Sequence, residues 1–484
     1  MNLGFESTDI ITLLPEIFLL TMACFILVVD VYLPEKLRHL TYQLAQGTLV
    51  GTLLLVISMH PSNLTFAMNN MFINDAMGAL LKLVILAIVF VVFLYSRSYL
   101  QARNILKGEY FVLGLFATLG MLIMVSAHNL LIIYLGLELM SLSLYAMVAM
   151  HRDSAQAAEA AMKYFILGAL ASGMLLYGMS ILYGVTGNLD LAAIATNMSD
   201  ADGNKHTALV FGLVFIVIGL AFKLGAVPFH MWIPDVYQGA PTAITLFISS
   251  APKIAAFAIL MRLLVDGLSS LYVDWQGMLI LLSILSMATG NIIAIAQTNI
   301  KRMFAYSTIS HVGFLMLGVL SANQAGYAAS LFYIITYSLM GLGGFGMILL
   351  LSRAGFEAEN LEDFKGLNER SPWYAFIMLI LMLSMAGVPP LLGFWAKWSV
   401  LNQVIQAGFI WLAVLAVLFA VIGAFYYLRI IKLMYFDKSE DRTPIEANMD
   451  MRITLSINGL IILFLGLMPD MLMAKCLEVL HVFI

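Results

Sequence analysis

The chain alternates between long apolar stretches and short polar segments. A transmembrane helix requires about 20 mostly apolar residues. Closed β-barrels instead show short strands of alternating polarity, which this sequence lacks. The pattern therefore predicts an all-α polytopic membrane protein with about 14 transmembrane helices. We place their centres near residues 22, 49, 84, 118, 140, 171, 215, 252, 286, 312, 340, 385, 420 and 462.

Composition agrees with this class and excludes several others. Hydrophobic residues make up 62% of the 484 positions and charged residues 11%, whereas soluble domains carry roughly 25% charged residues. The net charge of −4 does not favour a nucleic-acid partner. The only two cysteines, Cys24 and Cys476, lie at opposite ends of the chain, so iron–sulfur or zinc sites are not expected. Glu6 and Asp9, with no lysine or arginine beside them, argue against a secretory signal peptide.

The basic residues support the number of spans and predict their orientation. Cytoplasmic loops of membrane proteins are enriched in lysine and arginine. One set of alternate loops contains 16 of the 24 basic residues, and the opposite set contains only Lys205, Arg262 and Lys475. Both termini are therefore predicted on the outer, periplasmic side. The cytoplasmic set is Lys36, Arg38, Arg97, Arg103, Lys107, Arg152, Lys301, Arg302, Arg353, Lys365, Arg370, Arg429, Lys432, Lys438, Arg442 and Arg452.

Six ionisable residues lie inside predicted spans, where each requires a reason. A charge at the bilayer centre costs roughly 2.5–3.5 kcal/mol on insertion scales. Such residues mark ion or proton pathways more often than accidents of sequence. They are Lys82, Glu138, Lys163, Lys223, Lys253 and Lys397.

Two interrupted helices indicate an internal repeat. Residues 225–232 read GAVPFHMW, and residues 386–395 read AGVPPLLGFW. The two Val-Pro pairs are 161 residues, or five helices, apart. Because five is odd, the second unit enters the membrane from the opposite side. This predicts two inverted five-helix repeats, helices 4–8 and 9–13, with helices 7 and 12 broken near an ion or substrate site.

The repeat divides the chain into four predicted parts. Residues 1–109 form helices 1–3, residues 110–265 form the first inverted repeat, and residues 266–440 form the second. Residues 441–484 form the C-terminal helix 14.

Lys223 and Glu138 are the strongest candidates for a functional site. Lys223 follows about fifteen apolar residues and comes just before the break in helix 7. Freed carbonyls at that break would favour a cation, while burial makes loss of its proton easier. Glu138, in the middle of helix 5, is predicted to be the counter-charge of a lysine. Its alternative role is structural, bonded to a neighbour such as Ser141.

Three further residues extend this set, and three others are weaker. Lys253 lies mid-span after a proline, His311 can pass a proton between two hydrogen-bonded partners, and Lys397 follows the break in helix 12. Lys163 lies four residues after Glu159, a spacing that suits a local ion pair. His230 is expected mainly to shape the break in helix 7, with a possible place on the proton path. Lys82 has no evident partner and is expected to be structural, with the length to reach toward the interface.

Together these residues resemble the antiporter-like subunits of respiratory complex I, relatives of the membrane subunits of multisubunit Na⁺/H⁺ antiporters. The resemblance covers the whole chain. In that family a helix 5 glutamate pairs with a helix 7 lysine, a helix 8 lysine connects, and a helix 12 lysine or glutamate faces the exit. The motifs that carry the resemblance are LGLELMSLSLYAM, AFKLGAVPFHMWIPDVYQGAPT, SSAPKIAAF, NIKRMFAYSTISHVGF and SMAGVPPLLGFWAKW.

The family has three branches in the membrane arm of the complex. One branch has glutamate at the helix 12 position, where this chain has Lys397. Another carries a long C-terminal amphipathic helix, whereas this sequence stops at Ile484 just after helix 14. The chain is therefore most similar to the third branch.

The resemblance implies a proton-translocating subunit of NADH:quinone oxidoreductase in the bacterial inner membrane. It implies that no cofactor is bound by this chain, and that NADH, FMN, iron–sulfur clusters and quinone belong to other subunits. The implied partners are the neighbouring subunits K and M, the lateral helix of subunit L, and phospholipids, with no nucleic acid. Two other functions stay open: a subunit of a free-standing Na⁺/H⁺ antiporter, and a structural spacer without transport.

Overall fold

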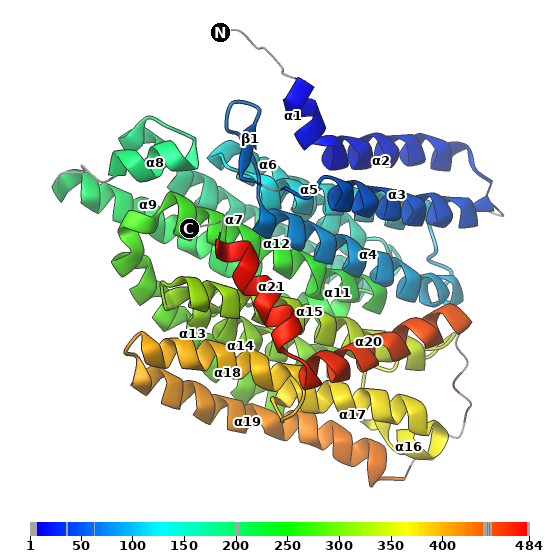
Figure 1. Ribbon diagram of the computed structural model, residues 1–484. Helices are drawn as coiled ribbons and strands as arrows, with labels where there is room; N and C mark the ends of the chain where they lie inside the picture. Colours follow the sequence, from blue (N-terminus) through cyan, green and yellow to red (C-terminus); the bar gives the residue numbers. More distant parts are fainter. Residues whose placement is uncertain are drawn as a thin grey trace.

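The computed structural model is built almost entirely from helices that run roughly parallel or antiparallel to one another (Figure 1). It describes residues 7–34, 37–61, 63–198, 203–438, 443, 445 and 448–481. Lys36 and Arg442, two of the predicted cytoplasmic basic residues, lie outside the described residues, as do both ends of the chain.

The helices begin and end as follows, in chain order. The first group is α1 (Ser7–Thr12), α2 (Leu14–Tyr32), α3 (His39–Ser58), α4 (Ala76–Ala102), α5 (Gly108–Ser126), α6 (Leu130–Val148), α7 (Ala155–Thr186), α8 (Leu191–Met198), α9 (Gly203–Leu224), α10 (Trp232–Gly239), α11 (Thr242–Ser249) and α12 (Ala251–Leu260). The second group is η2 (Met261–Gly267), η3 (Ser269–Leu271), α13 (Tyr272–Ile295), α14 (Ile300–Leu320), α15 (Gln324–Leu351), η4 (Leu361–Phe364), α16 (Leu367–Arg370), α17 (Pro372–Ala386), α18 (Leu392–Gln406), α19 (Ile410–Tyr435), α20 (Met449–Leu467) and α21 (Asp470–His481).

The predicted spans all fall on helices. Among the described residues, 13 segments are long and apolar enough to cross a membrane. The fourteenth predicted span is divided between α17 and α18, which have 15 residues each and are too short individually. The break in helix 12, rather than a missing span, therefore explains the difference between thirteen and fourteen.

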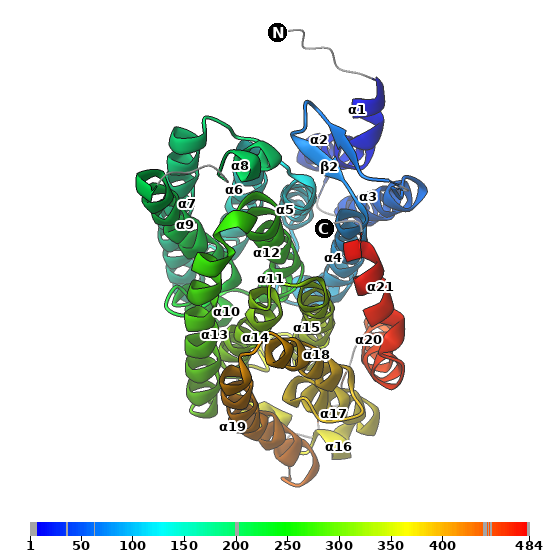
Figure 2. The ribbon, with the colours of Figure 1, turned by 60° about the vertical axis from the view of Figure 1, so that its left-hand side comes forward.

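The spans form a broad bundle in which the most buried helices carry the candidate residues. Seen partly along their axes in Figure 2, the helices extend from α2 and α3 at one edge to α17 and α19 at the other. An 18-residue stretch of the span Thr242–Gly267, which carries Lys253, is buried throughout, and so is one of Ile300–Leu320, which carries His311. By contrast, Leu14–Tyr32 is only 28% buried within the chain. The centre of the bundle is therefore shielded from lipid by the chain itself.

Polar caps start several of these helices. The side chain of Asp75 accepts a hydrogen bond from the backbone of Gly78 at the start of α4, and Asn299 accepts one from Arg302 at the start of α14. Such caps satisfy backbone N–H groups that have no partner inside the helix. Before α4, a short antiparallel hairpin pairs β1 (Thr65–Ala67) with β2 (Phe72–Asn74). The sequence pattern did not predict this hairpin.

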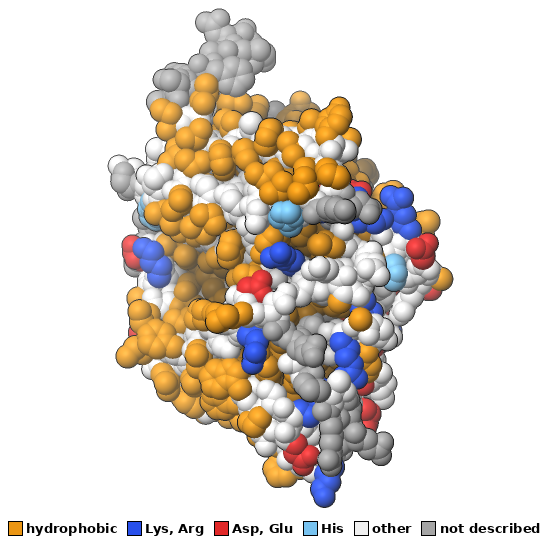
Figure 3. Space-filling model, turned by 90° about the vertical axis from the view of Figure 1, so that its right-hand side faces the viewer, with side chains coloured by type: hydrophobic (Ala, Val, Ile, Leu, Met, Phe, Trp, Pro, Cys, Tyr) orange, Lys and Arg blue, Asp and Glu red, His pale blue; other side chains and the backbone are white. Residues whose placement is uncertain are grey.

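One end of the bundle carries the basic loops. In Figure 1 the α2–α3, α4–α5 and α19–α20 connections all lie on the right-hand side. Figure 3 looks onto this end, and Lys and Arg side chains are scattered over it among hydrophobic ones. We call it the basic end and the opposite one the outer end.

Candidate functional site

Two predicted breaks interrupt the bundle, and each begins at a glycine. α9 ends at Leu224 and α17 at Ala386, and the next residues, Gly225 and Gly387, both have φ +86°. Residues with a Cβ rarely adopt this left-handed backbone. Space is also limited there, because a Cβ on Gly225 would collide with the side chain of Ile233. Each glycine therefore ends a half-helix at a fixed place.

A lysine caps each half-helix at its broken end. The Nζ of Lys253 donates to the carbonyl oxygens of Lys223 at 3.4 Å and Leu224 at 2.8 Å. The Nζ of Lys397 donates to those of Met385 at 3.0 Å and Ala386 at 2.9 Å. Carbonyls at a helix C-terminus lack internal partners and carry partial negative charge, so they favour an ammonium group. The two lysines thus perform the same task at the two breaks.

The capped carbonyls relate the breaks residue by residue. Gly225 and Gly387 are 162 residues apart, and the same offset relates Lys223 to Met385 and Leu224 to Ala386. This offset is one residue longer than the spacing of the Val-Pro pairs. Each break also contains one cis peptide bond, Val227–Pro228 in the first and Pro389–Pro390 in the second.

The cation at the first break is not the one that the sequence predicted. We expected the freed carbonyls to hold Lys223, but Lys253, thirty residues further along the chain, occupies them. The Nζ of Lys223 points instead to the Oγ of Ser141 on α6, at 2.7 Å. The prediction was wrong because side chains on a helix lean toward its N-terminus, so the Lys223 side chain points away from the carbonyls at the C-terminal end of α9.

Glu138 lies near Lys223 without a direct ion pair among the described residues. It is one turn before Ser141 on α6, and its Oε1 is buried with no hydrogen-bond partner. The Ser141 hydroxyl donates to the carbonyl of Leu137 at 2.6 Å, so it is not bonded to Glu138. The predicted direct pair is therefore absent from this structure, and a serine hydroxyl contacts the lysine in its place.

His311 has two hydroxyl partners, as a proton-passing histidine requires. Its Nδ1 is 2.7 Å from the hydroxyl of Tyr333, and its Nε2 is 3.1 Å from that of Tyr427. The Tyr427 hydroxyl also contacts Ser307 at 2.5 Å. Which ring nitrogen carries the proton depends on these hydroxyls. A proton arriving at one nitrogen can leave from the other.

Aromatic rings line the two capping lysines and connect the second one to His311. The Nζ of Lys253 lies 4.9 Å from the ring centroid of Trp232, and the Nζ of Lys397 lies 5.3 Å from that of Phe314. Phe314 in turn stacks against Tyr333, the partner of His311, with 6.3 Å between centroids. Rings of this kind stabilise a buried cation without neutralising it. Lys397 also borders a groove of about 580 Å³ between α18 and α19.

The weaker candidates lie in ion pairs or beside the break. Lys163 pairs with Glu159 at 2.8 Å, which confirms the local pair that was predicted, and with Asp235 at 2.8 Å. Asp235 also pairs with Arg302 at 2.9 Å. His230 lies in the break, and its Nδ1 is buried without a hydrogen-bond partner among the described residues. The contacts of Lys163 therefore tie α7 to α10, away from the capped carbonyls.

Lys82 has the partner that the sequence did not reveal. Its Nζ lies 2.5 Å from Oε1 of Glu16, and both side chains are almost fully buried between α2 and α4. Lys82 therefore forms an ion pair inside the bundle instead of reaching toward the interface, which agrees with the structural role expected for it. An acid sixty-six positions away in the chain gives no local signal, so only the packing of α2 on α4 identifies the pair.

Arg262, predicted on the outer side, is a second buried cation with a structural partner. It is completely inaccessible and donates from Nη1 and Nη2 to the two carboxylate oxygens of Asp75, each at 2.8 Å. It also donates to the carbonyl of Val125. The Arg262 guanidinium thus joins η2 to the start of α4 and to the last turn of α5. All three lie at the outer end of the bundle. Arg262 lies at the end of the bundle opposite the basic loops, but it is buried and is not a loop residue in water.

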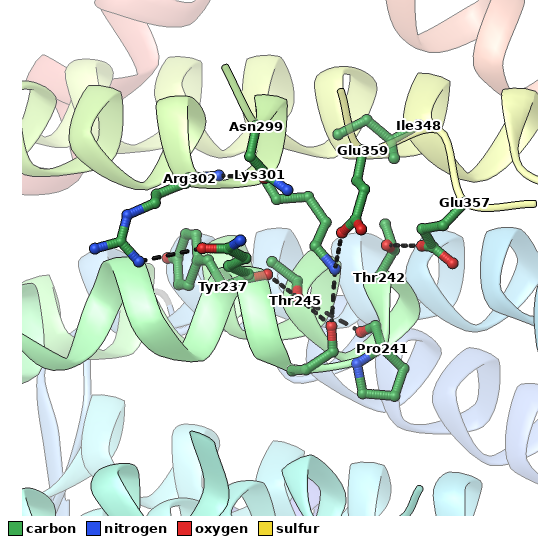
Figure 4. Close-up of polar contacts among 12 residues, drawn as sticks. Tyr237, Pro241, Thr242, Thr245, Asn299, Lys301, Arg302, Ile348, Glu357 and Glu359 are labelled. Atoms are coloured by element: carbon green, nitrogen blue, oxygen red, sulfur yellow. Dashed lines mark hydrogen bonds and ion pairs between the residues drawn. The ribbon is translucent and has the colours of Figure 1, made fainter. Parts of the chain in front are cut away.

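A polar cluster at the basic end, which we call the basic-end cluster, was not predicted as a site, and Figure 4 shows its members Thr242, Lys301, Glu357 and Glu359. Glu357 accepts hydrogen bonds from the hydroxyl groups of Tyr99 and Thr242, and it forms an ion pair with Arg103. Lys301 is buried and donates to the carbonyl of Ala240 at 3.1 Å, with Glu359 at 3.9 Å. A cavity of about 170 Å³ borders these groups. The cluster is composed of Tyr99, Arg103, Thr242, Lys301, Glu357 and Glu359, with the carbonyl of Ala240.

The fold and the site define an antiporter-like membrane subunit, and comparison with known proteins agrees. The family model described as NADH:quinone oxidoreductase/Mrp antiporter, TM, matches residues 127–423. That range includes Glu138, Lys223, Lys253, His311 and Lys397. The chain belongs to this family.

Sequence relatives identify the branch. NADH-quinone oxidoreductase subunit N of Thioalkalivibrio sulfidiphilus (strain HL-EbGR7) is 60% identical over 470 residues, covering 97% of this chain and 98% of its own. A chain of respiratory complex I from Thermus thermophilus is 30% identical, covers 95% of this chain and 98% of its own, and has a TM-score of 0.81. A chain of the Mrp complex from Dietzia sp. DQ12-45-1b has a TM-score of 0.85 at 20% identity, covering 98% and 96%. That likeness concerns the fold alone, so within the family this chain is a subunit N relative.

Proposed function

We propose that this chain translocates protons as a membrane-arm subunit of NADH:quinone oxidoreductase, through a relay of Glu138, Lys223, Lys253, His311 and Lys397. The observation that carries the proposal is the pair of lysine-capped breaks. Lys253 and Lys397 each bind two backbone carbonyls at the end of a half-helix inside the membrane. A helix cap alone would need only a fixed positive charge, whereas a lysine can also release its proton.

The relay is proposed to work through changes of charge at the first break. Protonation of Lys223 is favoured when Glu138 is near and disfavoured when it is screened or distant. Ser141, which contacts Lys223, lies one turn after Glu138 on α6. A small movement of α6 against α9 would therefore alter the proton affinity of Lys223. The proton would pass by Lys253 and His311 to Lys397.

The energies involved are modest. Moving one charge against 100 mV costs about 2.3 kcal/mol. A hundredfold change in the proton affinity of a site corresponds to about 2.7 kcal/mol. One lysine whose counter-charge approaches and withdraws can supply a change of this size. Lysine suits the task, because both its charged and neutral forms are accessible in a buried site.

Proton uptake is proposed at the basic-end cluster. Its cavity is bordered by Lys301, Glu357 and Glu359, and the carbonyl of Ala240 in the α10–α11 link accepts from Lys301. α11 continues from that link toward α12, which carries Lys253. Lys163 and His230 are proposed to support the α10 segment. The ion pairs that Asp235 forms with Lys163 and Arg302 attach the α10 segment to α7 and to α14.

The surroundings follow from the same proposal. The chain lies in the bacterial inner membrane with the basic end toward the cytoplasm and both termini periplasmic. It contacts subunits K and M, the lateral helix of subunit L, and phospholipids. NADH, FMN, the iron–sulfur clusters and quinone are bound by other subunits. The four-part division at residues 109, 265 and 440 describes the N-terminal helices, the two repeats and the C-terminal region.

The rival function, a free-standing Na⁺/H⁺ antiporter subunit, makes a different prediction. In our account the chain co-purifies with quinone-reducing subunits, and liposomes containing that complex pump protons on addition of NADH and quinone without any Na⁺. The measurement is the pH change inside the liposomes in Na⁺-free buffer, with an uncoupler as control. Purification without those subunits, or proton movement that requires Na⁺, would support the antiporter instead.

A further inference from the structure

A groove at the basic end has the composition of a lipid site and belongs to none of the relay. It has a volume of about 430 Å³ and lies between the starts of α17 and α20. Ser371, Trp373, Arg452, Ser456 and Leu460 are among the residues that line it. One part of its lining is polar and aromatic, and the rest is aliphatic. This division is what an amphipathic ligand requires.

The polar part presents a cation with free donors. Arg452 is exposed in the first turn of α20, and its Nε donates to the hydroxyl of Tyr374 at 3.0 Å. No contact of its two terminal amino groups is found among the described residues, so both can bind an anion. The helix N-terminus beside it carries partial positive charge, which also favours an anion. The nearest acid of this turn, Asp450, accepts a hydrogen bond from the backbone of Met451.

An aromatic side chain marks the depth of the membrane surface. Trp373 is 45% exposed at the start of α17, and its indole N–H donates to the hydroxyl of Ser456 at 2.8 Å. Tryptophan and arginine are typical of the boundary between lipid head groups and acyl chains. Trp373 and Arg452 thus lie at the depth at which the phosphate and glycerol groups of a lipid are found.

The apolar part continues along α20 into the membrane. Ile453, Ile457, Leu460 and Phe464 are 42–50% exposed and follow one another at helical spacing. From Ile453 to Phe464 the helix rises about 16 Å. The hydrocarbon core is about 30 Å thick, so this stripe is as long as one leaflet is deep. An acyl chain whose head group is held at Arg452 fits along it.

We propose that this groove binds one anionic phospholipid of the leaflet at the basic end. The phosphate binds the terminal amino groups of Arg452, the glycerol region lies against Trp373, and an acyl chain covers the stripe on α20. The anionic head group matches the two terminal amino groups of Arg452, for which no partner is found among the described residues. A free phosphate would leave the apolar stripe uncovered, and a helix of another subunit would leave the guanidinium without its anion.

The test uses the whole purified complex in lipid nanodiscs, with spin-labelled phosphatidylglycerol as the probe. We expect Arg452→Gln to weaken binding of this probe at the groove about fivefold, the size of one arginine near an anionic surface. Lys432→Gln is the matched control, because it removes the same charge from an exposed residue at the same end, outside the groove. It should leave binding unchanged. Trp373→Phe keeps a ring while removing the indole donor, and should weaken binding more modestly.

Three outcomes would overturn the proposal. The first is equal binding of phosphatidylglycerol by the Arg452→Gln and unaltered complexes. The second is equal binding of spin-labelled phosphatidylcholine, or displacement of the probe by inorganic phosphate alone. The third is a cross-link from a photoreactive group at position 456 to another subunit rather than to lipid. Because Arg452 is exposed, its replacement by glutamine should not prevent assembly, and the amount of complex recovered checks this.

Discussion

Replacing Lys253 with alanine is expected to lower NADH-driven proton pumping by roughly tenfold or more in the assembled complex. The change removes the ammonium group that caps the first break, and the carbonyls of Lys223 and Leu224 lose this donor. An increase of 1.4 kcal/mol in the barrier to proton transfer already slows that step tenfold. The measurement is the initial rate of interior acidification in liposomes, divided by the amount of intact complex.

A second buried lysine provides the control for this result. Lys82 lies in a transmembrane helix and is nearly as buried as Lys253, but it is paired with Glu16 outside the relay. The double replacement Lys82→Met with Glu16→Gln removes the pair without leaving an unpaired buried charge. Pumping per assembled complex should be retained. If it falls as far as in Lys253→Ala, then loss of any buried lysine disturbs the subunit, and the relay is not supported.

Replacing Lys397 with arginine is expected to abolish most pumping, even though it preserves the positive charge. Arginine can still donate to the carbonyls of Met385 and Ala386, but its guanidinium does not release a proton in proteins. The neighbouring groove of about 580 Å³ gives the larger side chain room. A proton carrier must alternate between two forms, and arginine has only one. The readout is again proton pumping per assembled complex.

Substitutions of Lys397 also distinguish a residue that carries protons from one that provides only a fixed positive charge. If Lys397 served only to neutralise the carbonyls at the end of α17, the arginine variant would pump normally and Lys397→Ala would not. We expect both variants to fail. Normal pumping in Lys397→Arg would therefore remove Lys397 from the relay and leave it as a helix cap.

Much of the architecture was predictable, because the membrane imposes strong local rules. The length of each apolar stretch gives the spans, and the glycine and proline residues near positions 225 and 387 give the breaks. The cost of a buried charge points to Lys223, Lys253 and Lys397. These signals are local in the chain, so one sequence is enough to find them.

The pairing of these residues was not predictable, because it depends on which helices meet. Lys253 caps carbonyls that lie thirty positions earlier, and Lys223 contacts a serine eighty-two positions away. The predicted partner of Lys223, Glu138, lies near it but forms no direct ion pair with it among the described residues. The polarity of the residues alone cannot decide whether Lys223 contacts the carboxylate of Glu138 or the hydroxyl of Ser141, because the two lie one turn apart on the same helix.

Two clusters of charge were hidden for a related reason. Lys301 and Arg262 both contributed to the prediction of orientation as if they were loop residues, but both are buried. The partners of Lys301 come from the α10–α11 link and from the segment after α15, and Arg262 binds Asp75 at the start of α4. A basic residue near the end of an apolar stretch gives the same sequence signal whether it faces water or closes onto an acid from a distant helix.

The most direct test of the relay is Lys223→Ala in the otherwise unaltered complex. In our proposal Lys223 is the residue where a distant redox event acts through Glu138. Among the described residues the hydrogen bond of its side chain goes to Ser141 on α6, and its backbone carbonyl, which Lys253 contacts, is kept in the alanine variant. The measurement is NADH-driven proton pumping together with the quinone reductase rate, both per assembled complex. We predict that both fall severalfold or more while assembly is normal. If both are unchanged in a normally assembled complex, protons do not pass through this site, and the chain is a structural spacer in the membrane arm.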